Sequence, residues 1–263
     1  MKKASFAGQF YSSNSNELEN NIKEMLKDAG KPLNRVFGII SPHAGYAYSG
    51  KAAAFSYKSI YKQKFDTFVI LGTNHSERGI GISDEDFETP LGIIKTDKEF
   101  VRLLKKDFGQ EFPSYEHSIE VQLPFIQHLF KAKIVPIAVS SDSYSECSRL
   151  AESIYDASKR LKRKICVVAS GDFTHYGEDY DFTDKKPSEI DPVAIKLIEK
   201  MDSKKFFEFS ENLTICGSSA ITVCIELCKK LGSKGAKLLK YYNSGDVSKD
   251  YRNIVGYASM AFI

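Results

Sequence analysis

The chain alternates short apolar runs with longer runs in which apolar residues recur every three or four positions. Short apolar runs predict buried strands, and helical spacing predicts helices that bury one face. The first amphipathic run covers 14–29 and stops at Gly30, which favours a helix end there. The predicted strands are 36–41, 67–71, 133–139, 165–169, 237–243 and 254–262, with short strands and turns in 79–96. The other predicted helices are 50–61, 98–107, 116–130, 144–161, 191–201, 203–211 and 218–231.

Two prolines and one loop modify this pattern. Pro124 lacks the N–H that a helix interior needs, so it kinks the predicted helix 116–130 or ends its first part. Pro136 indicates that its strand is an edge strand or has a bulge. The polar loop 177–190 is either a mobile flap or an exposed connection. We favour the connection, because most loops only connect elements.

Strands that alternate with helices predict an α/β fold with a largely parallel sheet covered on both faces. The chain is 42% hydrophobic and 27% charged, which is typical of a globular protein with a sizeable core. No repeat or linker interrupts the pattern. We therefore expect a single domain over residues 1–263.

The charge balance and the apolar runs restrict the partners and the location. Lys and Arg number 37 against 34 Asp and Glu, a net charge of +3, which does not favour a nucleic-acid partner. The N-terminus lacks the apolar segment of a secretory signal, and no run approaches the ~18 apolar residues of a membrane span. We expect a cytoplasmic protein that binds neither nucleic acid nor membrane.

Five cysteines, an odd number without a CxxC pair, indicate a reducing compartment rather than a disulfide framework. Cys224 and Cys228 lie one turn apart in an apolar helix, and Cys166 lies in a strand, so all three are predicted core residues. Cys147 has no polar neighbours and receives no role. Cys216 lies at the start of a predicted helix, whose N-terminus stabilises a thiolate that can bind a metal or attack an electrophile.

Three of the five histidines follow predicted strands: His43, His75 and His175. Ligands of open α/β sheets bind beyond the carboxyl ends of the strands, so these loops are expected to share one site. Imidazole binds zinc, copper and iron, and it exchanges protons near neutral pH. The pattern therefore predicts a metal site, a proton-transfer site, or both.

Acidic residues accompany two of the histidines. Asp172 lies three residues before His175 and can hydrogen-bond and orient its ring, or it can cap a backbone N–H in a turn. Glu116 and Glu120 flank His117 at a predicted helix start. Here the acids can cap the helix, or His117 can point into the cleft beside the other histidines.

These motifs together resemble the Memo family. The N-terminal AGQFYSS is also similar to the family's AGxFYP, with Ser12 in place of the proline. The matching segments run over nearly the whole chain in the family's order: PHAGYAYSG (42–50), LGTNHS (71–76), EHSIEVQLPF (116–125), SGDFTHYG (170–177) and TICGSS (214–219).

The resemblance implies an α/β/α sandwich with a mostly parallel central sheet, similar to the class III extradiol (LigB-like) dioxygenases, which are non-haem iron enzymes. It implies that His43, His75 and Cys216 are the metal ligands and that Asp172 and His175 line the same pocket. The family has been linked to iron or copper. A thiolate ligand also suits zinc, and it differs from the two-His, one-carboxylate set of the dioxygenases.

Three functions follow as alternatives. The first is a dioxygenase-like redox enzyme, in which His175, oriented by Asp172, is the acid–base group, and Tyr46, Tyr48 and His117 line the substrate space. The second is a non-catalytic scaffold that binds a peptide or small molecule. The third is nucleophilic catalysis by Cys216 with His175 as base. The resemblance also suggests a radical-SAM protein and an AMMECR-type protein as partners.

Overall fold

The computed structural model describes residues 1–263, and one eight-stranded sheet organises them. Its strand order is β3-β6-β2-β7-β1-β10-β8, and β9 pairs with β10 outside this path. The four central strands are parallel: β6 (Lys133–Ser140), β2 (Thr67–Thr73), β7 (Ile165–Ser170) and β1 (Gly38–Ser41). The predicted α/β class with a mostly parallel central sheet is confirmed.

Antiparallel strands flank the parallel centre. β10 (Ile254–Phe262) lies between β1 and β9 (Ala236–Asn243), and its first residues pair with β8 (His175–Tyr176). At the other side β3 (Gly79–Ile82) pairs with β6. A separate hairpin consists of β4 (Phe87–Thr89) and β5 (Gly92–Ile94).

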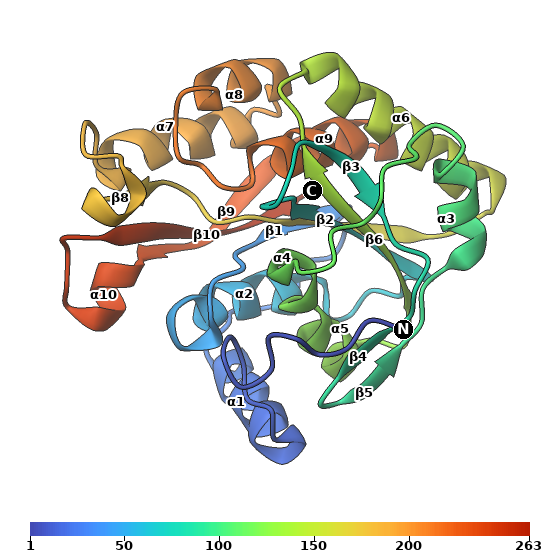
Figure 1. Ribbon diagram of the computed structural model, residues 1–263, viewed down its shortest axis with the longest axis horizontal. Coiled ribbons are helices and arrows are strands. Elements are labelled where there is room, and N and C mark those ends of the chain that lie inside the picture. The colour runs from blue at the N-terminus through green and yellow to red at the C-terminus, as the bar shows by residue number, and fades with distance from the viewer.

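Helices cover both faces of the sheet, as Figure 1 shows. Because side chains alternate along a strand, Phe68 and Ile70 of β2 enter one core while Val69 and Leu71 enter the other. One face carries α1 (Ser15–Lys27), α2 (Tyr46–Ile60), α4 (His117–Glu120) and α5 (Leu123–Leu129). The other carries α3 (Lys98–Leu104), α6 (Tyr144–Arg160), α7 (Pro187–Glu199), α8 (Ser203–Ser210) and α9 (Ser218–Leu231). Two short helices, η1 (Glu178–Tyr180) and α10 (Ser244–Ser248), lie near the ends of β8 and β9.

The prolines behave differently from each other. Pro124 lies in the first turn of α5, so the predicted helix 116–130 is two helices, and Pro124 separates them. The prediction that Pro136 marks an edge strand or a bulge is wrong, because β6 runs regularly between β3 and β2. Pro136 is tolerated because its nitrogen faces the point where the β3 ladder ends. There its carbonyl still accepts a hydrogen bond from the Ser83 N–H at 3.2 Å.

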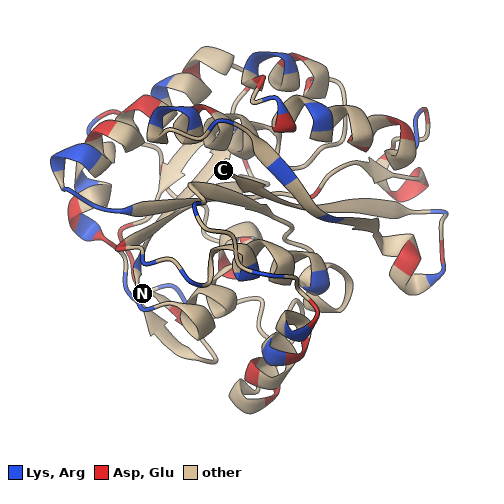
Figure 2. Ribbon diagram, turned by 180° about the vertical axis from the view of Figure 1, so that it is seen from behind, with Lys and Arg blue, Asp and Glu red and all other residues tan.

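Lys, Arg, Asp and Glu lie mostly along the helices and loops, with both signs mixed, while the strands carry few of them (Figure 2). Four of the five cysteines, Cys147, Cys166, Cys224 and Cys228, are buried. No helix is both long enough and apolar enough to cross a membrane.

The buried ring of Phe68 offers a test of the packing. Phe68→Ala should lower the free energy of unfolding by about 3–5 kcal/mol, because it leaves a cavity in the core beneath β2. Urea denaturation measures this change. The matched control is Tyr61→Ala, since Tyr61 is 47% exposed and its loss should change stability by no more than about 0.5 kcal/mol. Equal effects of the two changes would contradict the assigned core.

Candidate metal centre

The site lies where the parallel strands end. His43 follows β1, His75 follows β2, and Asp172 follows β7. Cys216 lies two residues before α9, and its loop meets the β7 loop at a very close approach. A Cβ built on Gly171 would lie 2.6 Å from the Cα of Gly217, so only glycines allow this contact. The close backbone contact brings Cys216 beside the histidine loops.

Two histidines meet one sulfur. The Cys216 Sγ lies 3.0 Å from His75 Nε2 and 3.3 Å from His43 Nε2. One ligand atom from each of His43, His75 and His117 lies within 4.8 Å of the others. The structure therefore brings together the predicted set His43, His75 and Cys216, and it adds His117, which we expected in the substrate space.

Glu116 fixes the orientation of His75. Its two carboxylate oxygens each lie 3.0 Å from His75 Nδ1, and Oε2 also accepts the backbone N–H of His75 at 3.0 Å. Oε1 accepts the N–H of Ser118 at 2.8 Å and so caps α4. Both alternatives for this segment are therefore realised, because the acid caps the helix while His117 joins the cluster. A carboxylate behind an imidazole is a common outer partner of metal-binding histidines.

A buried hydroxyl sets the tautomer of His43. Ser170 Oγ donates its only proton to the Ser118 carbonyl at 2.5 Å, and it accepts from Gln122 Nε2 at 2.8 Å. Its remaining contact is with His43 Nδ1 at 3.4 Å. Because the hydroxyl proton is already used, Nδ1 must be the donor and Ser170 Oγ the acceptor. Nε2 is the His43 nitrogen that faces Cys216. It offers a lone pair to a metal when the ring is neutral, and it donates an N–H to the thiolate when the ring is protonated.

Asp172 does not orient His175, contrary to our prediction. His175 Nδ1 donates instead to the carbonyls of Phe173 and Thr214, at 3.1 and 3.2 Å. Asp172 is 2% exposed and accepts the backbone N–H of His43 at 2.8 Å, so it joins the loop after β7 to the loop after β1 rather than capping a turn of its own. The two carbonyls require Nδ1 to carry the proton, so Nε2 of neutral His175 is free to accept one.

The remaining predicted site residues occupy different environments. Tyr46 is 9% exposed, and its hydroxyl donates to the Val121 carbonyl at 2.8 Å, so that hydroxyl is engaged inside the fold. Tyr48 is 45% exposed in the first turn of α2. The sulfur of Cys216 contacts His43 and His75, not His175, so the pairing that the nucleophile alternative requires is absent.

Charges within the cluster shift several pKa values. Burial disfavours the imidazolium of His75, but hydrogen bonds to Cys216 and Glu116 outweigh burial and raise its pKa to about 10. Burial likewise opposes the Cys216 thiolate, yet the charge of His43 and hydrogen bonds from both histidines lower its pKa to about 6. Burial and the charges of His43 and His75 lower the pKa of His117 to about 3. Burial raises the pKa of Asp172 to about 6.

The donor set and its spacing fit a transition-metal ion. Around a tetrahedral metal, bonds of ~2.3 Å to sulfur and ~2.0 Å to nitrogen would place these atoms about 3.5 Å apart. The observed separations of 3.0 and 3.3 Å are close to that value. Imidazole and thiolate together suit copper, zinc and iron better than magnesium or calcium.

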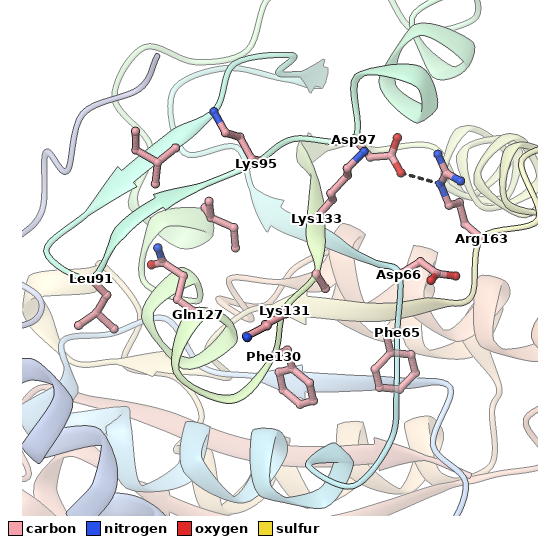
Figure 3. A pocket seen from close by; sticks show the side chains of 13 residues that line it. Phe65, Asp66, Leu91, Lys95, Asp97, Gln127, Phe130, Lys131, Lys133 and Arg163 are labelled. Atoms are coloured by element: carbon pink, nitrogen blue, oxygen red, sulfur yellow. Dashed lines mark hydrogen bonds and ion pairs between the residues drawn. The ribbon is translucent and has the colours of Figure 1, made fainter.

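A large pocket lies at the opposite, amino end of the parallel strands. Figure 3 shows its lining, with Asp97 bonded to Arg163 and the rings of Phe65 and Phe130 on one side. No histidine or cysteine lines this pocket of about 680 Å³. The pocket is therefore separate from the metal-competent cluster.

Fold and site together define an α/β protein with a histidine–cysteine cluster at the carboxyl edge of its parallel strands. The family model described as "Memo-like protein" matches residues 2–261. The chain belongs to the Memo family.

Relatives agree with this assignment, and one solved structure shares the fold. A MEMO1 family protein of Methanococcus vannielii is 42% identical over 239 residues, which cover 85% of this chain and 82% of the relative. One from Desulfurococcus amylolyticus is 40% identical over 100% of this chain and 99% of its own. The crystal structure of an uncharacterized protein from Escherichia coli K12 aligns with a TM-score of 0.52 at 11% identity, covering 87% of this chain and 100% of that one. That likeness shows the fold alone.

Sequence reasoning missed two polar residues that support the cluster. Glu116 was interpreted only as a helix cap, and Gln122 received no role. Glu116 could have been found because it directly precedes His117, which is not at the end of a strand and so called for another explanation. Gln122 is fully buried, and a polar side chain in an otherwise apolar helical stretch indicates a buried hydrogen-bond network.

The pairing of Cys216 with His75 predicts a pH titration. In metal-free protein, thiolate absorbance near 240 nm should rise with a midpoint near pH 6, because the lowered pKa of Cys216 governs it. Burial raises the pKa of Cys147, Cys166 and Cys228, so their thiols should not contribute there. The stability that the thiolate provides is complete above its usual pKa of 9.0 and is lost as pH falls through 6.

His75→Gln should move this midpoint upward, because it removes one stabilising donor and its positive charge. His128→Gln is the control, since His128 pairs with Glu19 outside the cluster and should leave the midpoint unchanged. If the thiolate titration of wild type had its midpoint near pH 9, the sulfur of Cys216 would not be stabilised by His43 and His75.

The contact between Glu116 and His75 predicts a change in metal affinity. Glu116→Gln should weaken Zn²⁺ or Co²⁺ binding by about 10–100-fold, because the neutral amide orients and polarises the imidazole less well. Competition with a chromophoric chelator measures it. Glu111→Gln, an exposed change outside the cluster, should bind like wild type. Wild-type affinity in Glu116→Gln would show that the carboxylate serves only as a helix cap.

Proposed function

We propose that this protein is a metal-dependent oxidoreductase whose centre holds iron or copper on His43, His75 and Cys216, with His117 within reach. The observation that supports this is the convergence of two imidazole nitrogens on one sulfur, at 3.0 and 3.3 Å, beside a third imidazole. Zinc fits the same donors. A thiolate among them favours a metal softer than magnesium or calcium.

The chain's own residues would divide the remaining work. Bound iron or copper supplies one-electron redox chemistry. His175 accepts a proton at Nε2, since its Nδ1–H is held by two carbonyls. Asp172 places a buried carboxylate beside the cluster, with one oxygen 3.9 Å from His43 Nε2. Exposed Tyr48 is a candidate contact for the substrate, either a small molecule or a peptide. A radical-SAM protein and an AMMECR-type protein remain proposed partners.

Metal analysis after anaerobic purification tests this function. Wild type should retain iron or copper near one ion per chain, while His43→Ala, His75→Ala and Cys216→Ser should each lose most of it. His128→Ala is the matched control, because its ring is half-buried but lies outside the cluster. The proposal fails if the three ligand variants bind iron and copper as well as wild type does.

A separate measurement tests the redox step. Reduced, metal-loaded wild type should consume dioxygen or show a reversible one-electron couple. His175→Gln should retain the metal but lose turnover, because Gln cannot accept the proton. If the wild-type protein binds only zinc and shows no redox couple, the proposed oxidoreductase activity is wrong, and a binding function replaces it.

A further inference from the structure

The N-terminal segment of residues 4–11, which includes most of the AGQFYSS motif, is fixed to the helix that carries His117. The anchor is Glu120, a carboxylate only 3% exposed. Its Oε1 accepts the Phe6 N–H at 2.8 Å and the Tyr11 hydroxyl at 2.6 Å, and its Oε2 accepts the Ser5 N–H at 3.0 Å. All three donors belong to the segment of residues 4–11. A buried carboxylate must keep its hydrogen bonds, because water cannot replace them. Glu120 therefore holds the N-terminal segment firmly against α4.

A second attachment joins the segment to α2. The Phe10 carbonyl accepts the Tyr46 N–H at 2.7 Å, in the first turn of the helix that follows the His43 loop. Gly8 makes the turn between these attachments at φ +86°, a conformation that suits glycine, and its N–H donates to the Tyr11 carbonyl at 2.7 Å. The segment therefore bridges α4, which carries His117, and α2, which follows the His43 loop.

His117 is the cluster residue with the weakest polar restraint. Its ring makes no hydrogen bond to another protein group, and the nearest carboxylate oxygen, on Glu116, is 3.7 Å away. Aromatic contacts hold the ring instead, including an edge contact with the His43 ring at 5.1 Å and 83°. His75 stacks on the His117 ring at 4.6 Å and 21°, and Phe10 packs on it at 4.7 Å and 35°. Phe6 adds an edge contact at 5.6 Å.

We propose that Phe6 and Phe10 are positioning residues of the metal centre, which hold the His117 ring against His75 so that its nitrogen stays with the cluster. Aromatic contacts of this kind favour particular ring orientations, so the two phenylalanines can select one orientation of the imidazole. Glu120 acts one step further out, because it holds the segment that presents both phenylalanines. The inference rests on the proposed metal site, but the position of the ring can be measured without metal.

The test compares Phe10→Ala with Phe10→Tyr and with Phe130→Ala, a matched half-buried phenylalanine at the distant pocket of Figure 3. Co²⁺ titration should show about tenfold weaker binding in Phe10→Ala. Phe10→Tyr, which keeps the ring, and Phe130→Ala should bind like wild type. Because Phe10 is not fully buried, the truncated variant is expected to fold, and Glu120→Gln provides a second variant with weakened attachment of the segment.

Diethylpyrocarbonate labelling of metal-free protein, mapped by mass spectrometry, provides the second readout. His117 should be modified several-fold faster in Phe10→Ala and Glu120→Gln than in wild type, relative to His128 in the same sample. If wild type binds Co²⁺, an unchanged affinity in Phe10→Ala overturns the positioning role whatever the labelling rate. If wild type binds no Co²⁺, the proposed metal function fails, and the labelling rate alone decides: faster labelling supports the positioning role, and an unchanged rate overturns it.

Discussion

The site depends on one buried polar segment, residues 116–122, packed against the end of β2. Four of its polar side chains, those of Glu116, Ser118, Glu120 and Gln122, each satisfy a group on a different element, so no partner can move without exposing an unpaired buried atom. Gly72 makes this packing possible, because any Cβ there would collide with Ser118 and Ile119. The partners are His75 for Glu116, the Thr73 carbonyl for Ser118, the N-terminal segment for Glu120, and Tyr57, Pro42 and Ser170 for Gln122.

Through this segment the sheet, the first loop and the N-terminus share a single network. His43 is reached through Ser170, which bonds to both Ser118 and Gln122. His75 is reached directly through Glu116. The two imidazoles that meet Cys216 are therefore oriented from the same few residues, and the sulfur arrives from the other side, on the loop before α9. This arrangement explains how loops far apart in sequence hold one cluster.

The sequence predicted long elements and strand-end residues well, for physical reasons. Apolar runs such as those of β2 and β7 must be buried, and residues that follow parallel strands share one edge, which is how His43 and His75 were found. Short elements such as β8 and α10 escaped because they bury too little to leave a pattern. His117 and the true partners of Asp172 and His175 depend on side-chain directions and backbone carbonyls, which spacing alone does not determine.

The position of β10 has a consequence for how the molecule is made. This nine-residue strand pairs with β1, β8 and β9, and its pairing with β8 includes His175 itself. During synthesis, residues 254–262 leave the ribosome after every other part of the sheet described above. The nascent chain must therefore keep the exposed edge of β1 from other strands until the last strand arrives, and slow completion at this step favours aggregation or chaperone binding.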